Sequence, residues 1–194
     1  KALQLKSDLY LKHGVEGGAW QAGGLGPDQG FMNGKYAMIL NGPWRLDSFR
    51  QAKINYGLSL VPRGPAGTST NVGGTDMVVF RKTRHPELAY EFLRFITSKD
   101  YQIRWARALD QIPVRLDAVE EVSKNCNPDL KAFMEQMRSA VGRPPVPNYQ
   151  ILDQVLSNEI ELALKGAKSP GEALASAGRE IERKVLAEIN AAVP

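Results

Sequence analysis

The stretch FMNGKYAMILNGPW, residues 31–44, contains the pattern that decides the fold class. Within it, residues 36–40 form a compact apolar run between two turn-forming segments, which is typical of a buried strand. Pro43 suits the first position of a following helix, and Leu46 and Phe49 would share one face of that helix. We therefore expect a strand, a turn and a helix in this order.

Short strands and helices continue to alternate toward the carboxyl end. Residues 55–61 and 77–80 predict two more strands, with the linker-like stretch 62–74, rich in Pro, Gly, Ser and Thr, between them. Helices are predicted from Pro86 to Ile96, between Ser98 and Pro113, from Asn127 to Gly142, from Gln150 to Lys165, and from Pro170 to Ala191. Ser169 and Glu172 have the spacing of a capping box at the start of the last helix. Short strands among many helices predict a layered α/β domain.

The amino-terminal part has weaker patterns. Ala2, Leu5 and Leu9 stand at helical spacing, and Gly14 is a suitable residue to end such a helix. Glycines are dense from residue 14 to residue 34, which predicts a loop that contains one short helical turn.

The composition excludes several classes of protein. With 43% apolar and 24% charged residues, the 194-residue chain can bury a real core, which rules out a disordered or collagen-like protein. The formal net charge is +4, and because basic residues are spread along the chain we expect no nucleic-acid partner. Cys126 is the single cysteine and His13 and His85 lie far apart, so no disulfide, metal site or other cofactor is predicted.

No residue pattern points to catalysis. Residues 30–35 have one residue too few between their glycines for a phosphate-binding loop, and a strand is predicted where that loop needs a helix. Residues 24–26 lack the preceding strand of a dinucleotide site, and residues 67–71 lack the last glycine of a nucleophile elbow. His85 fits a helix cap before Pro86. We therefore predict a binding function and no catalytic residues.

Trp44 directly follows the first predicted strand, and loops at the carboxyl ends of strands line the ligand crevice in open α/β sheets. Position alone leaves two interpretations open, a core tryptophan or an exposed plate for a ligand with an apolar face. Sugars are such ligands, because one face of a pyranose is a row of C–H groups and its rim carries hydroxyls. Asn41, Thr75 and Asp76 stand at strand ends, where their side chains could bind those hydroxyls.

The order of several motifs resembles one protein family. Phe31-x-x-Gly34-Lys35-x-Ala37-Met38, followed by Asn41-Gly42-Pro43-Trp44, resembles the family 1 extracellular solute-binding proteins of ABC importers, in particular their maltose-binding-protein-like carbohydrate group. Three further stretches agree in order, namely Asn55-Tyr56-Gly57 with Pro62, Gly73 to Val79 followed by His85 to Phe92, and Gly166 with Glu172-Ala173-Leu174. The resemblance covers nearly the whole chain.

This resemblance implies a fold and a function. Members have an α/β, periplasmic-binding-protein-like type II fold of two lobes, of which this chain resembles the C-terminal half. They are substrate-binding components of ABC transporters, and their two lobes close by a hinge motion on a sugar or oligosaccharide. The resemblance therefore implies no enzyme activity, no cofactor, a periplasmic or extracellular location with or without a lipid anchor, and membrane permease subunits as partners.

The resemblance also assigns ligand-binding residues. Trp44 corresponds to the tryptophan that stacks on sugar, and Gly73-Gly74-Thr75-Asp76 matches a segment that faces the cleft from the opposite lobe. The group's second aromatic plate falls on Asp153 and the tyrosine after it on Gln154, so the pattern departs here, although Tyr149 lies one turn earlier and could compensate. This departure implies a smaller or differently linked sugar than a maltodextrin. The two aspartates of the assigned set could each accept two hydroxyls of a sugar diol, or be helix caps or surface charges.

The resemblance divides the chain among the lobes. Residues 1–62 correspond to part of the second lobe, residues 63–111 to a linker and a segment of the first lobe, and residues 112–194 to a helical return to the second lobe. Members of the family are much longer than this chain. We therefore expect a piece of a longer protein, whose export signal and missing N-terminal half lie outside the sequence, and we expect that half as a folding partner.

Two other functional classes stay open on the sequence. The same fold could bind a non-sugar solute such as glycerol phosphate, a polyamine or iron. A phosphate would need Arg45, Arg63 or Arg115 in the cleft, because a guanidinium binds oxyanions in a bidentate way. A carbohydrate-active hydrolase would need two carboxylates across a cleft, for which Asp76 and Asp153 come from different segments.

Overall fold

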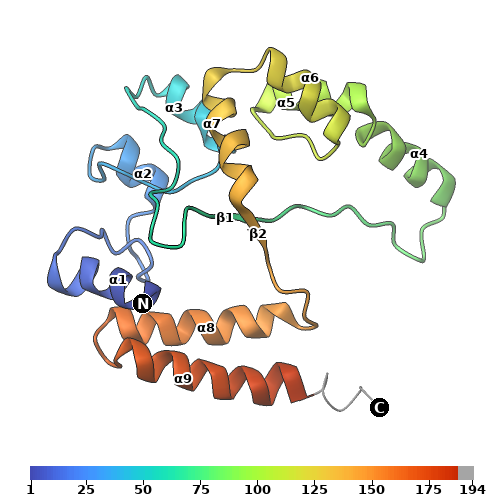
Figure 1. The fold of residues 1–194 in the computed structure, drawn as a ribbon. Coiled ribbons are helices and arrows are strands. Elements are labelled where there is room, and N and C mark those ends of the chain that lie inside the picture. The colour runs from blue at the N-terminus through green and yellow to red at the C-terminus, as the bar shows by residue number, and fades with distance from the viewer. Residues whose placement is uncertain (188–194) are drawn as a thin grey trace. The chain divides into compact units, whose positions relative to one another are not determined.

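The computed structural model describes residues 1–187, and the chain divides into two compact units (Figure 1). Unit 1 consists of Lys1–Ala37 and the chain from Pro144 onward, and unit 2 is Met38–Arg143. Each unit has a buried apolar cluster of its own, so each is described by itself.

Unit 1 is built on a helical hairpin of α8 (Tyr149–Leu164) and α9 (Pro170–Ile181), which lie side by side in Figure 1. Ala163 and Leu164 of α8 pack with Ala173 of α9 and with Leu3 of α1 (Ala2–Ser7). The two alanines are fully buried, and their small side chains let the helices approach closely.

The ends of the hairpin follow the sequence closely. Gly166 ends α8 in the left-handed conformation with φ +73°, which glycine adopts without strain. The capping box that starts α9 is present, since the Glu172 amide donates to Ser169 Oγ at 3.2 Å and the Ser169 amide donates to Glu172 Oε2 at 2.9 Å. A π-helical turn, Glu182–Leu186, continues α9, and the last predicted helical residues, 188–191, lie outside the described residues.

The amino-terminal helix forms as predicted but buries a different face. After α1 a π-helical turn, Asp8–Lys12, runs on, and Gly14 follows it with φ +61°. Leu3 is buried whereas Leu5 is exposed, because the hairpin covers the side of α1 that carries Leu3. The glycine-rich loop contains one short helix, α2 (Pro27–Met32), as expected.

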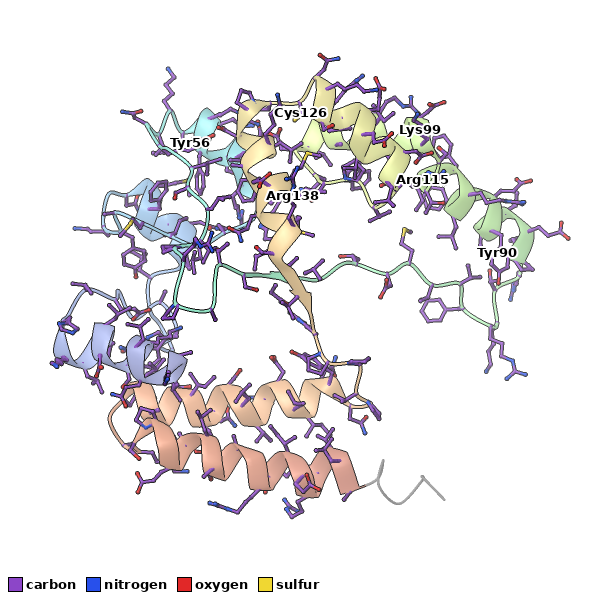
Figure 2. All side chains as sticks on the ribbon, viewed as in Figure 1. Tyr56, Tyr90, Lys99, Arg115, Cys126 and Arg138 are labelled. Carbon is purple, nitrogen blue, oxygen red and sulfur yellow. The ribbon has the colours of Figure 1, made fainter. Side chains whose placement is uncertain are left out.

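Unit 2 carries the remaining helices. In chain order they are α3 (Leu46–Gln51), α4 (Pro86–Ile96), α5 (Lys99–Leu109), α6 (Leu116–Lys124) and α7 (Pro128–Gln136). Ala106 of α5, Val122 of α6 and Leu130 of α7 form the buried cluster, and the half-buried Cys126, labelled in Figure 2, packs against it. Ser98 caps α5 by accepting a hydrogen bond from the Tyr101 amide, which confirms the predicted start of that helix.

The strands differ most from the prediction. The described residues contain two strands, β1 (Thr70–Val72) and β2 (Ala140–Gly142), which pair in parallel with Thr70 opposite Ala140. β1 lies in the stretch predicted as a linker. β2 replaces the end of the helix predicted to reach Gly142, because α7 ends at Gln136 and a single 3₁₀ turn, Met137–Ser139, leads into the strand.

The three strands predicted over residues 36–40, 55–61 and 77–80 were wrong as secondary structure for this chain. These residues carry no ladder hydrogen bonds with any described residue, and the trace from β1 to α4 runs without a neighbouring strand in Figure 1. A strand forms only where a second segment supplies hydrogen-bond partners for its backbone. Several of their apolar side chains are exposed as well, for example Val78 at 74% and Phe80 at 80%.

No helix among the described residues is both long and apolar enough to span a bilayer.

Candidate functional site

Trp44 stands on a short, ordered turn in unit 2. Asn41 Oδ1 accepts a hydrogen bond from the Gly42 amide at 2.8 Å, and the Gly42 carbonyl accepts one from the Arg45 amide at 3.3 Å. The buried Pro43 begins a 3₁₀ turn, Pro43–Arg45, that runs directly into α3. The Trp44 side chain is left 59% exposed, so it is not a core tryptophan in this chain.

The helix after this turn fixes it to the rest of unit 2. Leu46 and Phe49 of α3 are buried, as their spacing predicted. The rings of Phe49 and Tyr56 meet edge to face with centroids 5.8 Å apart, and the hydroxyl of Tyr56, which is labelled in Figure 2, donates to Asp129 Oδ2 of α7 at 2.7 Å. Burial, helped by the hydrogen bond to Asp129, raises the pKa of Tyr56 above its ordinary value, which keeps the hydroxyl protonated as a donor.

A second link holds the end of α3 to α5. Arg50 forms an ion pair with Asp110, whose side chain is only 10% exposed. Asp110 ends α5 in the left-handed conformation with φ 51°, which turns its carboxylate toward α3. The hydrogen bond to Asp110 raises the pKa of Arg50, so the guanidinium stays protonated. The turn that carries Trp44 is therefore mounted on a helix tied to α5 and α7.

Sequence reasoning missed these supporting residues. Arg50 and Asp110 are 60 positions apart, and Tyr56 and Asp129 are 73 positions apart. Pairs at such separations leave no local pattern, because only the folded chain brings them together.

The predicted segment 73–76 follows β1. Since β1 and β2 are parallel, their carboxyl ends lie at one edge of the pair, and polar side chains placed there are typical of a ligand site. Gly73, Gly74, Thr75 and Asp76 are all exposed. Their contact with a ligand stays a prediction.

Tyr149 and Asp153 lie on the first two turns of α8 in unit 1. Four residues apart on a helix, they share a face, on which Tyr149 is half-buried and Asp153 is exposed. The eight predicted site residues are thus divided between the units, with Asn41, Trp44 and the segment 73–76 in unit 2. The structure leaves the ligand role of each of them as a prediction.

The three arginines that a phosphate ligand would need are either paired with a carboxylate or exposed. Arg115 already holds Asp117 with two hydrogen bonds of 2.9 Å, from Nε and from an η nitrogen, so its guanidinium edge is occupied. This pairing lowers the pKa of Asp117 and raises that of Arg115. Arg45 and Arg63 are exposed. Among the described residues, no three His, Cys, Asp or Glu side chains are grouped closely enough to hold a metal ion.

The family model and two relatives that match this chain are all solute-binding or sugar-binding proteins. The model of a family described as bacterial extracellular solute-binding protein matches residues 1–132. The chain is 28% identical over 121 residues to a maltodextrin-binding protein of Bacillus subtilis, covering 61% of this chain and 29% of that protein. It is 24% identical over 160 residues to a galactooligosaccharide-binding protein of the same organism, covering 81% of this chain and 38% of that protein.

A solved structure agrees with the same fold. The maltose-maltodextrin binding protein of Alicyclobacillus acidocaldarius superimposes with a TM-score of 0.75 at 25% identity, covering 93% of this chain and 49% of that one. The helix-rich α/β arrangement therefore corresponds to part of a maltose-binding-protein-like, two-lobe fold, as the sequence predicted. The chain spans between about 29% and 38% of the length of the two curated relatives.

Proposed function

Because this chain belongs to the bacterial extracellular solute-binding proteins, we propose that it is part of the substrate-binding component of an ABC transporter. In this proposal the receptor binds a sugar or oligosaccharide between two lobes, which close by a hinge motion and exclude water from the ligand. It performs no chemical step and needs no cofactor. The observation that carries the proposal is the exposed indole of Trp44 on an anchored turn, in a chain similar to oligosaccharide-binding proteins.

The indole supplies the apolar part of recognition. A pyranose places its C–H face on the flat ring, which replaces weakly bound water on both surfaces. The turn beneath Trp44 is held by α3 and its ties to Asp110 and Asp129, so the ring plane needs little ordering when sugar arrives. A preorganised plate of this kind increases affinity because less conformational entropy is lost on binding.

The polar part of recognition is assigned to short side chains. Asn41, Thr75, Asp76, Tyr149 and Asp153 supply hydroxyl, amide or carboxylate groups to the sugar rim, and a carboxylate can accept two adjacent hydroxyls. Gly73 and Gly74 carry no side chain, so their backbone can approach the ligand closely. Hinge closure would bring the segment 73–76 onto a sugar already stacked on Trp44.

The sugar class follows from what replaces the aromatic positions. With Asp153 and Gln154 where the maltose-binding group carries aromatic rings, we propose a ligand with fewer stacked units or a different linkage than a maltodextrin. The two curated relatives carry names for two different oligosaccharide classes, which supports a sugar ligand and leaves its identity open.

The remaining assignments concern the longer receptor. We propose a periplasmic or extracellular location, permease subunits as membrane partners, and the lobe division at residues 1–62, 63–111 and 112–194. The exposed apolar side chains of Met77, Val78 and Phe80, which are neighbours along the chain, support a covering partner in the N-terminal half of the same protein, since a contiguous exposed apolar patch usually marks an interaction surface.

A ligand screen on the full-length receptor tests the proposal. A sugar panel is added during thermal unfolding, because a ligand at a hundred times its dissociation constant stabilises the folded state by about 2.7 kcal/mol. At least one mono- or oligosaccharide should raise the melting temperature by several degrees. Glycerol phosphate, spermidine and ferric citrate form the comparison arms, and chromogenic glycosides test for turnover. Stabilisation by a comparison ligand with no response to any sugar, or hydrolysis of a glycoside, would contradict the proposal.

A further inference from the structure

The indole of Trp44 lies against the backbone of Gly42. A Cβ atom built on Gly42 would come within 2.1 Å of both Cη2 and Cζ3 of the Trp44 ring and within 2.5 Å of Cε3. A point beyond the edge of the ring could approach two adjacent ring atoms this closely but would lie much farther from the third. The three distances therefore place the six-membered ring face down on the Gly42 Cα.

The backbone does not require a glycine at this position. Gly42 has φ −106° and ψ 169°, an extended conformation that any residue adopts. Gly42 is also buried, and what it is buried under includes the ring of Trp44. The requirement for glycine therefore comes from the indole, because a methyl group there would occupy the space of the ring.

In unit 1 the ring of Tyr36 also lies against glycine backbone, but it is covered more than the indole of Trp44. A Cβ on Gly17 would lie 2.3 Å from Cε1 of the Tyr36 ring, and a Cβ on Gly30 would lie 2.2 Å from Cδ2, near the other edge of the ring. Tyr36 Oη also donates to the Leu25 carbonyl at 3.0 Å. Two glycines and a hydrogen bond thus hold the half-buried Tyr36 in place. Trp44 has one glycine beneath it and remains 59% exposed.

We infer that Gly42 is a positioning residue, which fixes the plane of the Trp44 indole so that one face rests on the backbone and the other is presented to the ligand. The ligand part of this inference rests on the proposed function. A side chain at Gly42 would tilt the indole about χ1 or χ2 and misalign the stacking surface. The fold itself should survive, because an exposed ring can move where a buried one cannot.

The test uses the full-length receptor labelled with 5-fluorotryptophan and three variants, Gly42→Ala, Trp44→Ala and Gly57→Ala. Gly57 is the matched control, since it lies in the same unit, has no positive φ, and has no atom within 4 Å of a Cβ built on it. The ¹⁹F resonance that disappears in Trp44→Ala is assigned to Trp44. Its chemical shift is recorded without ligand, and the dissociation constant of the sugar found by the screen is measured by calorimetry.

We expect Gly42→Ala to shift the Trp44 resonance in the sugar-free protein and to weaken sugar binding about tenfold, whereas Gly57→Ala should do neither. An unshifted resonance in Gly42→Ala overturns the inference whatever the sugar affinity. A shifted resonance with unchanged affinity, in a protein where Trp44→Ala does weaken binding, overturns its ligand part. If Trp44→Ala leaves the affinity unchanged, the proposed stacking role fails, and the ¹⁹F shift alone decides the placement of the ring.

A double-mutant cycle keeps the inference testable if Gly42→Ala unfolds more easily than expected. Any loss of stability caused by Gly42→Ala should disappear in the Trp44→Ala background, because the ring that collides with the new methyl group is gone. An equal loss in both backgrounds would show that the methyl group meets something other than the indole and would overturn the inference.

Discussion

The α8–α9 hairpin and the segment 73–85 both carry apolar side chains, but only the hairpin buries them. Leu164 is 1% exposed, whereas Val78 and Phe80 of the segment are 74% and 80% exposed. A helix completes its backbone hydrogen bonds within itself and needs a neighbour only for its apolar face. An extended segment needs a neighbour for both backbone and side chains. A helical hairpin can therefore bury its apolar face within this chain, whereas the exposed side chains of the extended segment fit the covering partner proposed above.

The largest expected effect concerns Phe80. In the longer receptor, Phe80→Ala should lower the free energy of unfolding by about 3–5 kcal/mol, because the proposal places another part of the protein over the ring. In the 194-residue chain the same substitution should change it by less than about 0.5 kcal/mol. Urea unfolding of both proteins measures the difference. If Phe80→Ala lowers the free energy of unfolding by the same small amount in both proteins, the proposed partner does not cover this ring.

In the α8–α9 hairpin, unlike at Phe80, an apolar side chain is already buried within this chain. Leu164→Ala should destabilise the chain by about 3 kcal/mol, since the side chain is buried among Leu3, Ala163 and Ala173 and its removal leaves a cavity. The matched control is Leu174→Ala on α9, because that side chain is 45% exposed, and the expected loss there is below about 1 kcal/mol. The urea midpoints of both variants are compared at one pH. Similar losses at the two positions would mean that the hairpin core is not where the structure places it.

A smaller effect comes from the polar contact across the hairpin. Glu159 on α8 accepts hydrogen bonds from Lys168 Nζ, at 2.7 Å to Oε2, and from Ser176 Oγ, at 3.1 Å to Oε1. The hydrogen bond from Lys168 lowers the pKa of Glu159 below its ordinary value of 4.5. The folded state therefore holds its proton less tightly than the unfolded state. The resulting stability is complete above the ordinary pKa and is lost as the pH falls through the lowered one.

Glu159→Gln should accordingly reduce stability at pH 7, and the difference from the parent should vanish in acid. Unfolding by urea at a series of pH values measures this profile. Lys168→Met serves as the control background, in which Glu159→Gln should cost less because the main partner is absent. A difference that stays constant from neutral to acid pH would contradict the assigned cause.

The sequence was sufficient to predict helix starts and ends, because these depend on local interactions. The start of α5 at Ser98, the capping box of Ser169 and Glu172, and the end of α8 at Gly166 each depend on residues within one helical turn. The predicted face of α1 was wrong, because which side of a helix is buried depends on a distant partner, here the α8–α9 hairpin.

The strands, unlike the helix ends, could not be predicted from local sequence. The run 36–40 has the composition of a buried strand, yet it forms none here, while β1 and β2 formed in segments predicted as linker and helix. Pairing between residues 70 positions apart decides those two strands, and no short window of sequence records it. The lobe division at residues 1–62, 63–111 and 112–194 also stays a prediction.

For the candidate site, the sequence located the turn but not its construction. Trp44 after Gly-Pro was identified from a strand-to-turn pattern, and its exposure excludes a core position in this chain, while its contact with a ligand stays a prediction. The support from Asp110 and Asp129 and the contact of the indole with Gly42 leave no pattern in the sequence, because they arise only in the folded chain. The ligand roles of Thr75, Asp76, Tyr149 and Asp153 stay predictions.

The dissociation constant of Trp44→Ala for the sugar found by the screen, measured by calorimetry on the full-length receptor, tests the central claim most directly. Loss of a stacking tryptophan costs about 2 kcal/mol or more, so the account predicts binding at least about 30-fold weaker than in the parent protein. Trp105→Ala, which removes another partly exposed tryptophan of unit 2, should leave the affinity unchanged. Equal affinity of Trp44→Ala and the parent protein would contradict the account.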